Sequence, residues 1–585
     1  MTRARPTVRR IAALLAGVAV LCWGGPVAAA GVAVEIEGVE GELRDNVRAF
    51  LGIVQHEFPP DAAPDARMVR RLHQEAPAEI RRALRPFGYY RPEIEARLES
   101  GDEGWRASYR IEPGPPVRLV DVDLRVTGAA ADDPAFDELI PSLPLVAGER
   151  LHHPDYETAK ARLMELAADR GYLEAVWRQN VLRIDIDTLE ARASLVLDSG
   201  PRYRFGEVRF ERTVLGDEFL RRYLRFQPGD PFLAGRLLDL QYALDDSDYF
   251  RRVDVRARRA DARDGRIPIT VELEARPKHR YTFGIGFGTD TGPRVSVGRE
   301  TRYLNERGHS LRMEAQVAAI STRLSGQYTI PLAQPWRERL ELHSSLGDEE
   351  IGDGDSRQFE LGGQLVTTGG GWQRTLSLDY QRSEDRLGGE VATRNLVMPG
   401  LGLVRSRFDD LIYATRGYRL AIDWNGGTET FGSDVSFARL RLGTNGVYRV
   451  WDGGRVLGRL QLGKVWVDPF EDLPLSQRFY AGGDQSVRGF AYQSLAPENA
   501  DGEVIGGRYL AVASLELEQL IAGNWGAAVF VDHGAAVNDL DDDLRTAAGI
   551  GLRYRSPVGV FRVDVAQATD GDESPRLHLS LGVNL

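Results

Sequence analysis

The residues best suited to specific chemistry lie in one long connection. Between two alternating segments, at 455–467 and 508–519, the sequence reads Gly482-Gly483-Asp484-Gln485-Ser486-Val487-Arg488-Gly489-Phe490. A loop of about 40 residues is far longer than an ordinary strand connection, so it is either disordered or functional. Glycine permits turns with positive φ, and the planar guanidinium of arginine can hold carboxylates through paired hydrogen bonds. The run therefore favours a shaped loop, in which Arg488 could meet acidic partners.

Acidic partners for this arginine can be placed by parity, because successive side chains of a strand point to opposite faces. Glu516 falls on the face opposite apolar Leu515, and Asp532 falls on the face opposite apolar Val531. We expect the acidic faces to line an interior, within reach of Arg488. On loop composition alone a solvated arginine is the favoured interpretation, since most arginines are exposed.

The rest of the sequence offers no catalytic constellation. It contains no G-x-S-x-G elbow, no H-E-x-x-H motif and no P-loop, so we expect no enzyme activity, cofactor or nucleotide. Gly284, Gly286 and Gly288 mimic a dinucleotide fingerprint, but they alternate within a strand that no helix follows. The only cysteine is Cys22, so the sequence offers no group of thiolates that could hold a metal, and we expect no metal. A formal net charge of −12 argues against nucleic acid as a partner.

The first half of the chain combines a leader with three repeats. Residues 1–30 have a basic start, a short apolar core and a small-residue end, which predicts a secretory signal peptide. Three units follow, at 31–115, 116–200 and 201–277, each of which reads strand-helix-helix-strand-strand. A small or polar residue precedes an aromatic where each second helix ends, at Gly88, Gly171 and Asp248. A glycine there fits a left-handed helix end.

The second half, 278–585, alternates with a period of two. We expect sixteen strands, beginning near 281, 293, 308, 322, 337, 356, 371, 396, 416, 433, 454, 507, 525, 546, 558 and 576. An even number of strands of about ten residues, apolar on one face and polar on the other, is typical of an antiparallel transmembrane β-barrel. A soluble sandwich also alternates, but aromatic residues near strand ends, such as Trp336 and Trp424, favour the membrane.

Three spaced motifs resemble those of the BamA-like outer-membrane assembly factor superfamily. Val487-Arg488-Gly489-Phe490 resembles its VRGF loop tip, and Phe530-Val531-Asp532-His533-Gly534 resembles its FxDxG strand. Residues 549–553 and 557–559 resemble its penultimate hairpin. In that family the loop arginine reaches into the barrel lumen and pairs with an acidic wall. The resemblance implies this role for Arg488, with Glu516 and Asp532 as its partners.

The same resemblance implies a function. The three repeats resemble POTRA domains, and their number favours the branch that forms translocation and assembly modules. The implied activity is insertion or secretion of outer-membrane proteins such as autotransporters. The implied partners are unfolded outer-membrane protein clients, outer-membrane lipid and a TamB-like periplasmic protein anchored in the inner membrane. A two-partner-secretion translocation pore is the alternative, and a passive porin is a more distant one.

The joint between the first and last strands is a candidate lateral gate. Three glycines of the first strand, at 284, 286 and 288, remove side-chain packing and weaken it. We expect this strand to close against a terminal strand that carries Leu577, Leu579, Leu581 and Leu585. An edge opened there would template a client strand through backbone hydrogen bonds. Leu585 departs from the aromatic residue that ends many outer-membrane barrels.

Overall fold

The computed structural model describes residues 31–58, 64–101, 104–557, 559–569 and 574–582. The predicted signal peptide, with Cys22, lies outside these residues, and so does Leu585. No helix in the described part of the chain has the length and apolar character needed to cross a membrane. The chain divides into two compact units. One runs to Arg204 and includes Pro231–Ala234, and the other holds Phe205–Asp230 and Gly235 onward.

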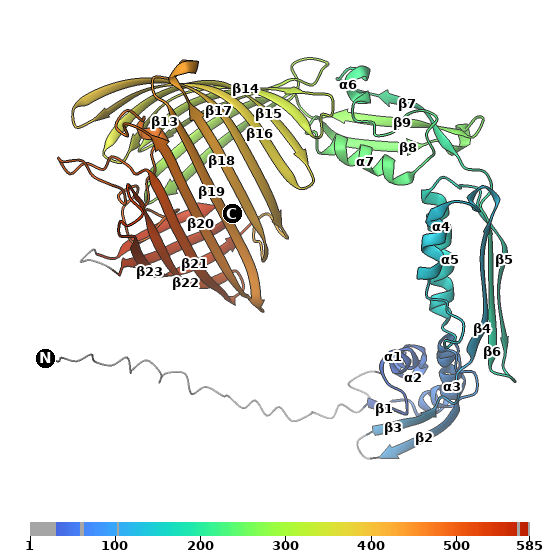
Figure 1. The fold of residues 1–585 in the computed structure, drawn as a ribbon. Helices are drawn as coiled ribbons and strands as arrows, with labels where there is room; N and C mark the ends of the chain where they lie inside the picture. Colours follow the sequence, from blue (N-terminus) through green and yellow to red (C-terminus); the bar gives the residue numbers. More distant parts are fainter. Residues whose placement is uncertain (1–30, 59–63, 102–103, 558, 570–573, 583–585) are drawn as a thin grey trace. The chain divides into compact units, whose positions relative to one another are not determined.

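The first unit contains two small α/β domains (Figure 1). The first domain consists of β1 (Gly31–Glu37), α1 (Gly41–Phe50), α2 (Gly52–Gln55), α3 (Ala66–Leu84), β2 (Glu93–Gly101) and β3 (Gly104–Glu112). The second consists of β4 (Arg118–Thr127), α4 (Pro134–Leu139), α5 (His153–Asp169), β5 (Val176–Asp185) and β6 (Glu190–Asp198). In each, the last strand lies in the middle of a three-stranded sheet, in the orders β1-β3-β2 and β4-β6-β5. The helices bury their apolar faces against one side of that sheet.

The second unit begins with the third repeat. This repeat consists of β7 (Arg204–Glu211), α6 (Asp217–Arg221), α7 (Ala234–Asp245), β8 (Phe250–Ala257) and β9 (Arg266–Ala275), with sheet order β7-β9-β8. The three repeats therefore share the predicted element order. Gly88, Gly171 and Asp248 have φ of 84°, 86° and 60°, so the left-handed helix ends are confirmed. Asp248 is the one of the three that carries a side chain.

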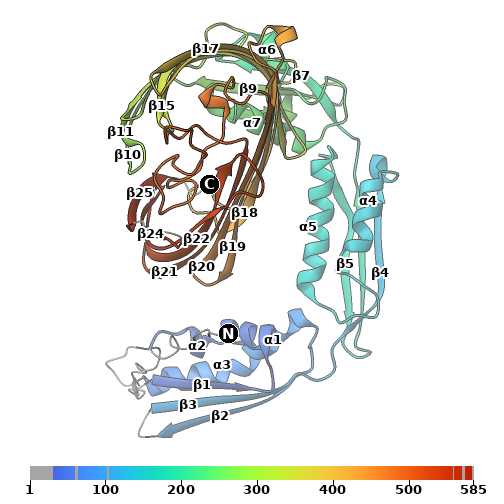
Figure 2. The ribbon, with the colours of Figure 1, turned by 60° about the vertical axis from the view of Figure 1, so that its left-hand side comes forward.

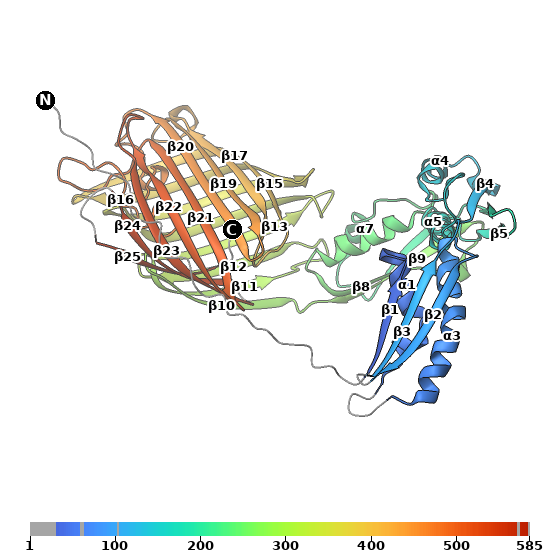
Figure 3. The same ribbon diagram turned by 90° about the horizontal axis from the view of Figure 1, so that it is seen from below.

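The remaining residues form the predicted sixteen-stranded antiparallel sheet, in which each strand pairs with the next in sequence (Figures 1 and 3). The strands are β10 (His279–Gly288), β11 (Gly292–Thr301), β12 (Ser310–Ala318), β13 (Ser321–Pro331), β14 (Glu338–Ile351), β15 (Gly354–Gly369), β16 (Trp372–Leu387), β17 (Glu390–Phe408), β18 (Arg416–Gly427), β19 (Phe437–Trp451), β20 (Gly454–Val467), β21 (Tyr509–Ala522), β22 (Trp525–Val537), β23 (Arg545–Ser556), β24 (Gly559–Ala568) and β25 (Arg576–Gly582). The predicted starts agree closely. The largest differences are at β17, predicted from 396, and β19, predicted from 433.

The sheet curls into a nearly closed barrel with an apolar outer face. Phe283 and Ile285 of β10 are 80% and 89% exposed, and Leu515 of β21 is 62% exposed. Their strand neighbours point into the lumen, where Glu516 and Asp532 are buried. Apolar side chains outside and polar ones inside are the pattern of a barrel in lipid.

Several strands are longer than the expected ten residues. β15 and β16 each have 16 residues and β17 has 19. A bilayer core needs only about 9–11 residues of tilted strand, so these strands extend beyond it. The alternation of apolar and polar residues shows where a strand begins, but it does not show how much of the strand lies in lipid.

The third repeat and the barrel meet through specific contacts within the second unit. The Tyr249 hydroxyl donates to the carbonyl of Gly308, in the connection between β11 and β12, at 2.5 Å. The Asp248 carboxylate lies 3.0 Å from Arg302 and 3.2 Å from Arg276. It also lies 3.7 Å from Arg280 of β10. These contacts connect the third repeat to the first strands of the barrel.

Candidate functional site

The long loop between β20 and β21 is ordered and packs inside the barrel. Its apolar residues join a cluster with lumen-facing residues of β17 and of β19 to β24, and Val487 and Phe490 of the tip are 0% and 3% exposed. Polar contacts extend to the far wall, where Gln477 donates to Gln381 of β16 at 2.9 Å. The two apolar anchors flank Arg488, so their packing fixes the position of the guanidinium between them.

Arg488 contacts both carboxylates that were predicted as its partners. Its Nε and Nη2 donate to the two oxygens of Asp532 at 2.7 and 3.0 Å, which is a bidentate pair. Its Nη1 donates to Glu516 at 2.8 Å and to Asp564 of β24 at 3.1 Å. The guanidinium also stacks on the ring of Phe530, 3.3 Å from the ring centre. The solvated alternative is wrong, because Arg488 is only 4% exposed.

The pair belongs to a larger buried network that sequence reasoning found only in part. Arg553 of β23 donates to Glu516 at 2.6 Å and to Glu518 at 3.0 Å. Arg455 of β20 donates to Glu518 at 2.7 Å. Glu518, Arg553 and Asp564 occupy lumen-facing positions of their strands, but parity does not reveal which strand of a barrel supplies each partner. A buried ion pair offsets its desolvation only when its remaining donors and acceptors are satisfied. In this network two arginines hold each of Glu516, Glu518 and Asp564, and Asp532 accepts from both Arg488 and the Ser514 hydroxyl.

Gly489 shows why a glycine follows the arginine. Its φ is 96°, a left-handed conformation. A Cβ there would lie 3.1 Å from the Cβ of Ala547 and 3.2 Å from the backbone nitrogen of Ala568. Its N–H donates to Nε2 of His578 in β25 at 3.1 Å. The loop tip therefore touches the last strand through backbone that no larger residue could bring as close.

The candidate gate lies where β10 and β25 run side by side (Figures 2 and 3). Each makes a backbone ladder with its other neighbour, β11 or β24. Between His279–Gly288 and Arg576–Gly582 no ladder forms, and the Leu579 N–H donates instead to the Thr289 hydroxyl at 3.3 Å. The expected strand pairing is thus replaced, over these described residues, by a side-chain contact. Leu577 and Leu581 are 52% and 41% exposed on the outer face, and the three glycines take the lumen parity expected of them.

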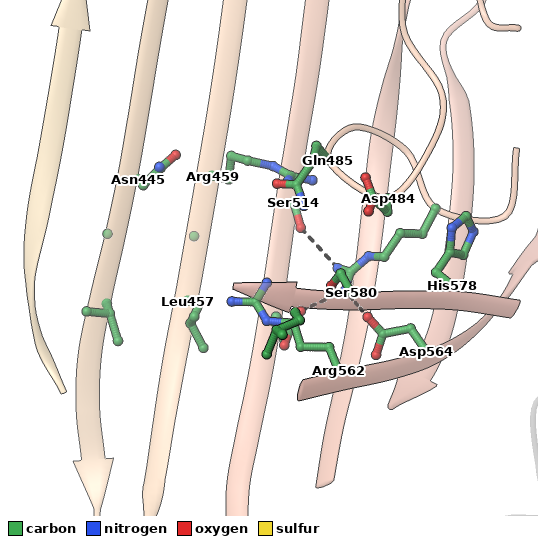
Figure 4. A pocket seen from close by; sticks show the side chains of 16 residues that line it. Asn445, Leu457, Arg459, Asp484, Gln485, Ser514, Arg562, Asp564, His578 and Ser580 are labelled. Carbon is green, nitrogen blue, oxygen red and sulfur yellow. Dashed lines mark hydrogen bonds and ion pairs between the residues drawn. The ribbon is translucent and has the colours of Figure 1, made fainter. Parts of the chain in front are cut away.

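A lumen pocket of about 160 Å³ lies beside the loop tip (Figure 4). Arg459 and Arg562 reach toward it from opposite sides, with Asp484, Asp564 and His578 around its far end. Arg459 donates to the carbonyl of Ser486 in the loop at 2.8 Å. The interior next to the loop is therefore polar and partly open, so its ion pairs border a small space rather than a solid core.

This fold and site define an outer-membrane barrel with periplasmic domains, and comparison with known families agrees. A model of the Omp85 superfamily domain matches residues 304–584. A model described as POTRA domain TamA domain 1 matches 33–113, and a POTRA model described as surface antigen variable number repeat matches 203–276. The chain therefore carries an Omp85 superfamily domain preceded by POTRA domains. It lies in the outer membrane of a Gram-negative bacterium, with the N-terminal domains in the periplasm.

Individual proteins are similar to this chain at low identity. Outer membrane protein assembly factor BamA of Nitratidesulfovibrio vulgaris is 23% identical over 395 residues, covering 63% of this chain and 49% of that protein. BamA of Neorickettsia risticii is 21% identical over 407 residues, covering 63% and 53%. The chain thus spans about half the length of these curated relatives. The crystal structure of Haemophilus ducreyi BamA lacking POTRA domains 1–3 matches with a TM-score of 0.67 at 18% identity, over 79% of this chain and 99% of that one. That likeness concerns the fold.

Proposed function

We propose that this chain is an outer-membrane assembly or translocation factor that inserts or secretes β-barrel proteins such as autotransporters. The observation that carries the proposal is the seam between β10 and β25, which lacks a backbone ladder over its described residues. Its clients are unfolded outer-membrane proteins, and it uses no catalytic residue, cofactor or nucleotide.

The physical basis is the cost of an open strand edge. In lipid each unsatisfied backbone group costs several kcal/mol, so an edge there must find hydrogen-bond partners. A client strand supplies them by adding to β10 or β25, in the manner of β-augmentation. The seam then acts as a lateral gate, with the glycines at 284, 286 and 288 on one side and Leu577, Leu579 and Leu581 on the other. In this proposal Arg488, held by Glu516 and Asp532, keeps the loop docked beside the gate.

Within the superfamily we propose that the chain acts as a TamA. Three repeats of the POTRA type and the match of 33–113 to the first TamA POTRA domain support this assignment. The proposal implies a TamB-like partner that is anchored in the inner membrane and meets the periplasmic domains. Photo-crosslinking from the exposed edge strands β2 and β5 in living cells tests it, and recovery of an inner-membrane-anchored protein is the expected result. If crosslinks form only to soluble chaperones or to other barrel proteins, the TamA assignment fails.

The gate is tested by locking it. Thr289→Cys with Leu579→Cys, joined by a short thiol crosslinker, should close the seam, because the Thr289 hydroxyl and the Leu579 nitrogen are 3.3 Å apart. The control is Leu376→Cys with Leu401→Cys, which face each other across β16 and β17 and point outward. We expect the seam lock to abolish the appearance of an autotransporter at the cell surface and the control lock to leave it intact. Normal assembly by the locked seam would refute the gate.

A further inference from the structure

Three segments that are far apart in sequence meet at one end of the seam. The turn after β10 contributes Asp290, the loop contributes Asp484 and Gly489, and β25 contributes His578. The Asp484 N–H donates to Oδ2 of Asp290 at 2.5 Å, and the Gly489 N–H donates to Nε2 of His578 at 3.1 Å. Oδ1 of Asp290 lies 3.7 Å from Nδ1 of His578. The loop thus touches both strands that flank the seam.

The hydrogen bond from Gly489 sets the chemical state of the histidine. A nitrogen that accepts a hydrogen bond carries no proton, so Nε2 is the bare nitrogen and the proton of the neutral ring lies on Nδ1. That Nδ1–H faces Asp290 and has no hydrogen-bond partner among the described residues. At 3.7 Å the contact is electrostatic rather than a direct hydrogen bond. The ring is 4% exposed, so little water screens it.

The cluster lies where the ends of β10 and β25 meet, so it can hold the two strands together. β10 leaves the periplasmic domains at His279 and reaches Asp290 just past its other end, and His578 lies near the start of the returning strand β25. The cluster therefore joins the ends of the two strands that are farther from the periplasm. Asp564, which faces His578 in the β24–β25 ladder, accepts from Arg488, so the histidine borders the buried ion network as well.

We propose that His578 is a positioning residue that couples the loop tip to the gate, an inference that rests on the function proposed above. With the tip docked, Gly489 orients the imidazole toward Asp290, and the Asp484 backbone holds that carboxylate in place. The far ends of β10 and β25 are then joined through the loop. When the tip leaves, both N–H donors leave with it, and the two strands lose the contact together.

The inference is tested by a distance across the seam in the full chain. Phe283→Cys in β10 and Leu581→Cys in β25 both point outward, and spin labels there report seam width in nanodiscs by pulsed electron resonance. His578→Phe removes both ring nitrogens, and we expect the distance distribution to shift to longer values. His578→Gln retains an acceptor and a donor and should restore the narrow distribution. His343→Phe is the matched control, because His343 of β14 makes a comparable contact with Asp379, 3.0 Å away, outside the seam.

Coupling, as opposed to simple support of the fold, is shown by combining variants. Arg488→Ala frees the loop tip and should widen the seam alone, but it should add nothing in a His578→Phe background. If the two effects add, or if His578→Phe leaves the seam at wild-type width, the coupling is refuted. Should His578→Phe fail to give a heat-modifiable barrel, Asp290→Asn carries the same expectation. Because the readout is a distance in purified protein, a seam that widens as expected while autotransporter assembly stays normal would refute the gate and leave the coupling standing.

Discussion

The two sides of the barrel are held together by different means. On one side, β16 and β17 form an unbroken ladder from Trp372 opposite Arg405 to Leu387 opposite Glu390. On the other, the described residues of β10 and β25 form no such ladder and meet through the side chains of Thr289, Asp290 and His578. The ion network around Arg488 lies near this second side, on β20 to β24.

The difference shows how a barrel can open at one place. Separating a ladder in lipid strands many backbone groups at several kcal/mol each. Separating side-chain contacts leaves few backbone groups without a partner. The molecule therefore relies on backbone bonds where it must stay closed, and on a removable loop where we propose that it opens.

The largest expected effect comes from removing the arginine of the ion network. Arg488→Ala strands Asp532 and leaves Glu516 and Asp564 with Arg553 alone, and loss of one partner from a buried pair costs about 3–5 kcal/mol. Unfolding of the purified barrel in urea and detergent measures the change. Arg405→Ala on β17 is the control, because that guanidinium lies over Trp372 and should cost about 1 kcal/mol or less. Equal losses of unfolding free energy in the two variants would contradict the proposed difference between the two sides of the barrel.

Hydrogen exchange should separate the two sides directly. Local opening free energies range from near zero up to the global value, and we expect amides of β16 and β17 to exchange at least about a hundredfold more slowly than those of β10 and β25. Exchange followed by mass spectrometry in nanodiscs gives both rates in one experiment. Similar protection in the four strands would contradict the comparison.

The loop contact near the seam should depend on pH. Burial and the neighbouring Asp290 carboxylate raise the pKa of Asp484 to about 6, while Arg459 of β20 opposes that rise and His578 of β25 lies close by. Because the folded state binds this proton more tightly than the unfolded chain, the stabilisation is complete below about pH 4 and is lost as pH rises through about 6. We expect unfolding of the wild type between pH 5 and 7.5 to show a loss on the order of 1–3 kcal/mol that Asp484→Asn lacks. If the free energy of unfolding depends on pH in the same way in both proteins, a group other than Asp484 causes the dependence.

The smallest effect concerns one glycine of the seam. A Cβ at Gly288 would meet only the Thr291 hydroxyl, at 3.1 Å, and this side chain can rotate away, so Gly288→Ala should stabilise β10 by about 0.5–1 kcal/mol. Gly443→Ala in β19 offers the same gain in open space away from the seam. We expect a modest slowing of client assembly for Gly288→Ala alone, measured as the rate of autotransporter surface exposure. Equal rates for the two variants would mean that the seam glycines do not limit opening.

The sequence predicted the fold well because alternation and repeats are local signals. Parity alone placed Glu516 and Asp532 inside the barrel, and the motif resemblance connected them to Arg488. His578 also took lumen parity, but its contact with Asp290 joins residues at opposite ends of the barrel sequence, and the turn that holds Asp290 has no local mark of that role. The absence of a ladder between the described residues of β10 and β25 was likewise beyond prediction, since glycines indicate a weak strand but not an unpaired edge.

Asp248 has a mechanical consequence. Glycine serves the equivalent left-handed position in the first two repeats, and a side chain there costs roughly 1–2 kcal/mol of backbone strain. The third repeat accepts that strain and gains a carboxylate that contacts Arg276, Arg280 and Arg302. Arg280 belongs to β10, and Arg302 directly follows β11. A rotation of the third periplasmic domain would therefore act through this carboxylate on the first hairpin of the barrel, which includes the strand that borders the seam.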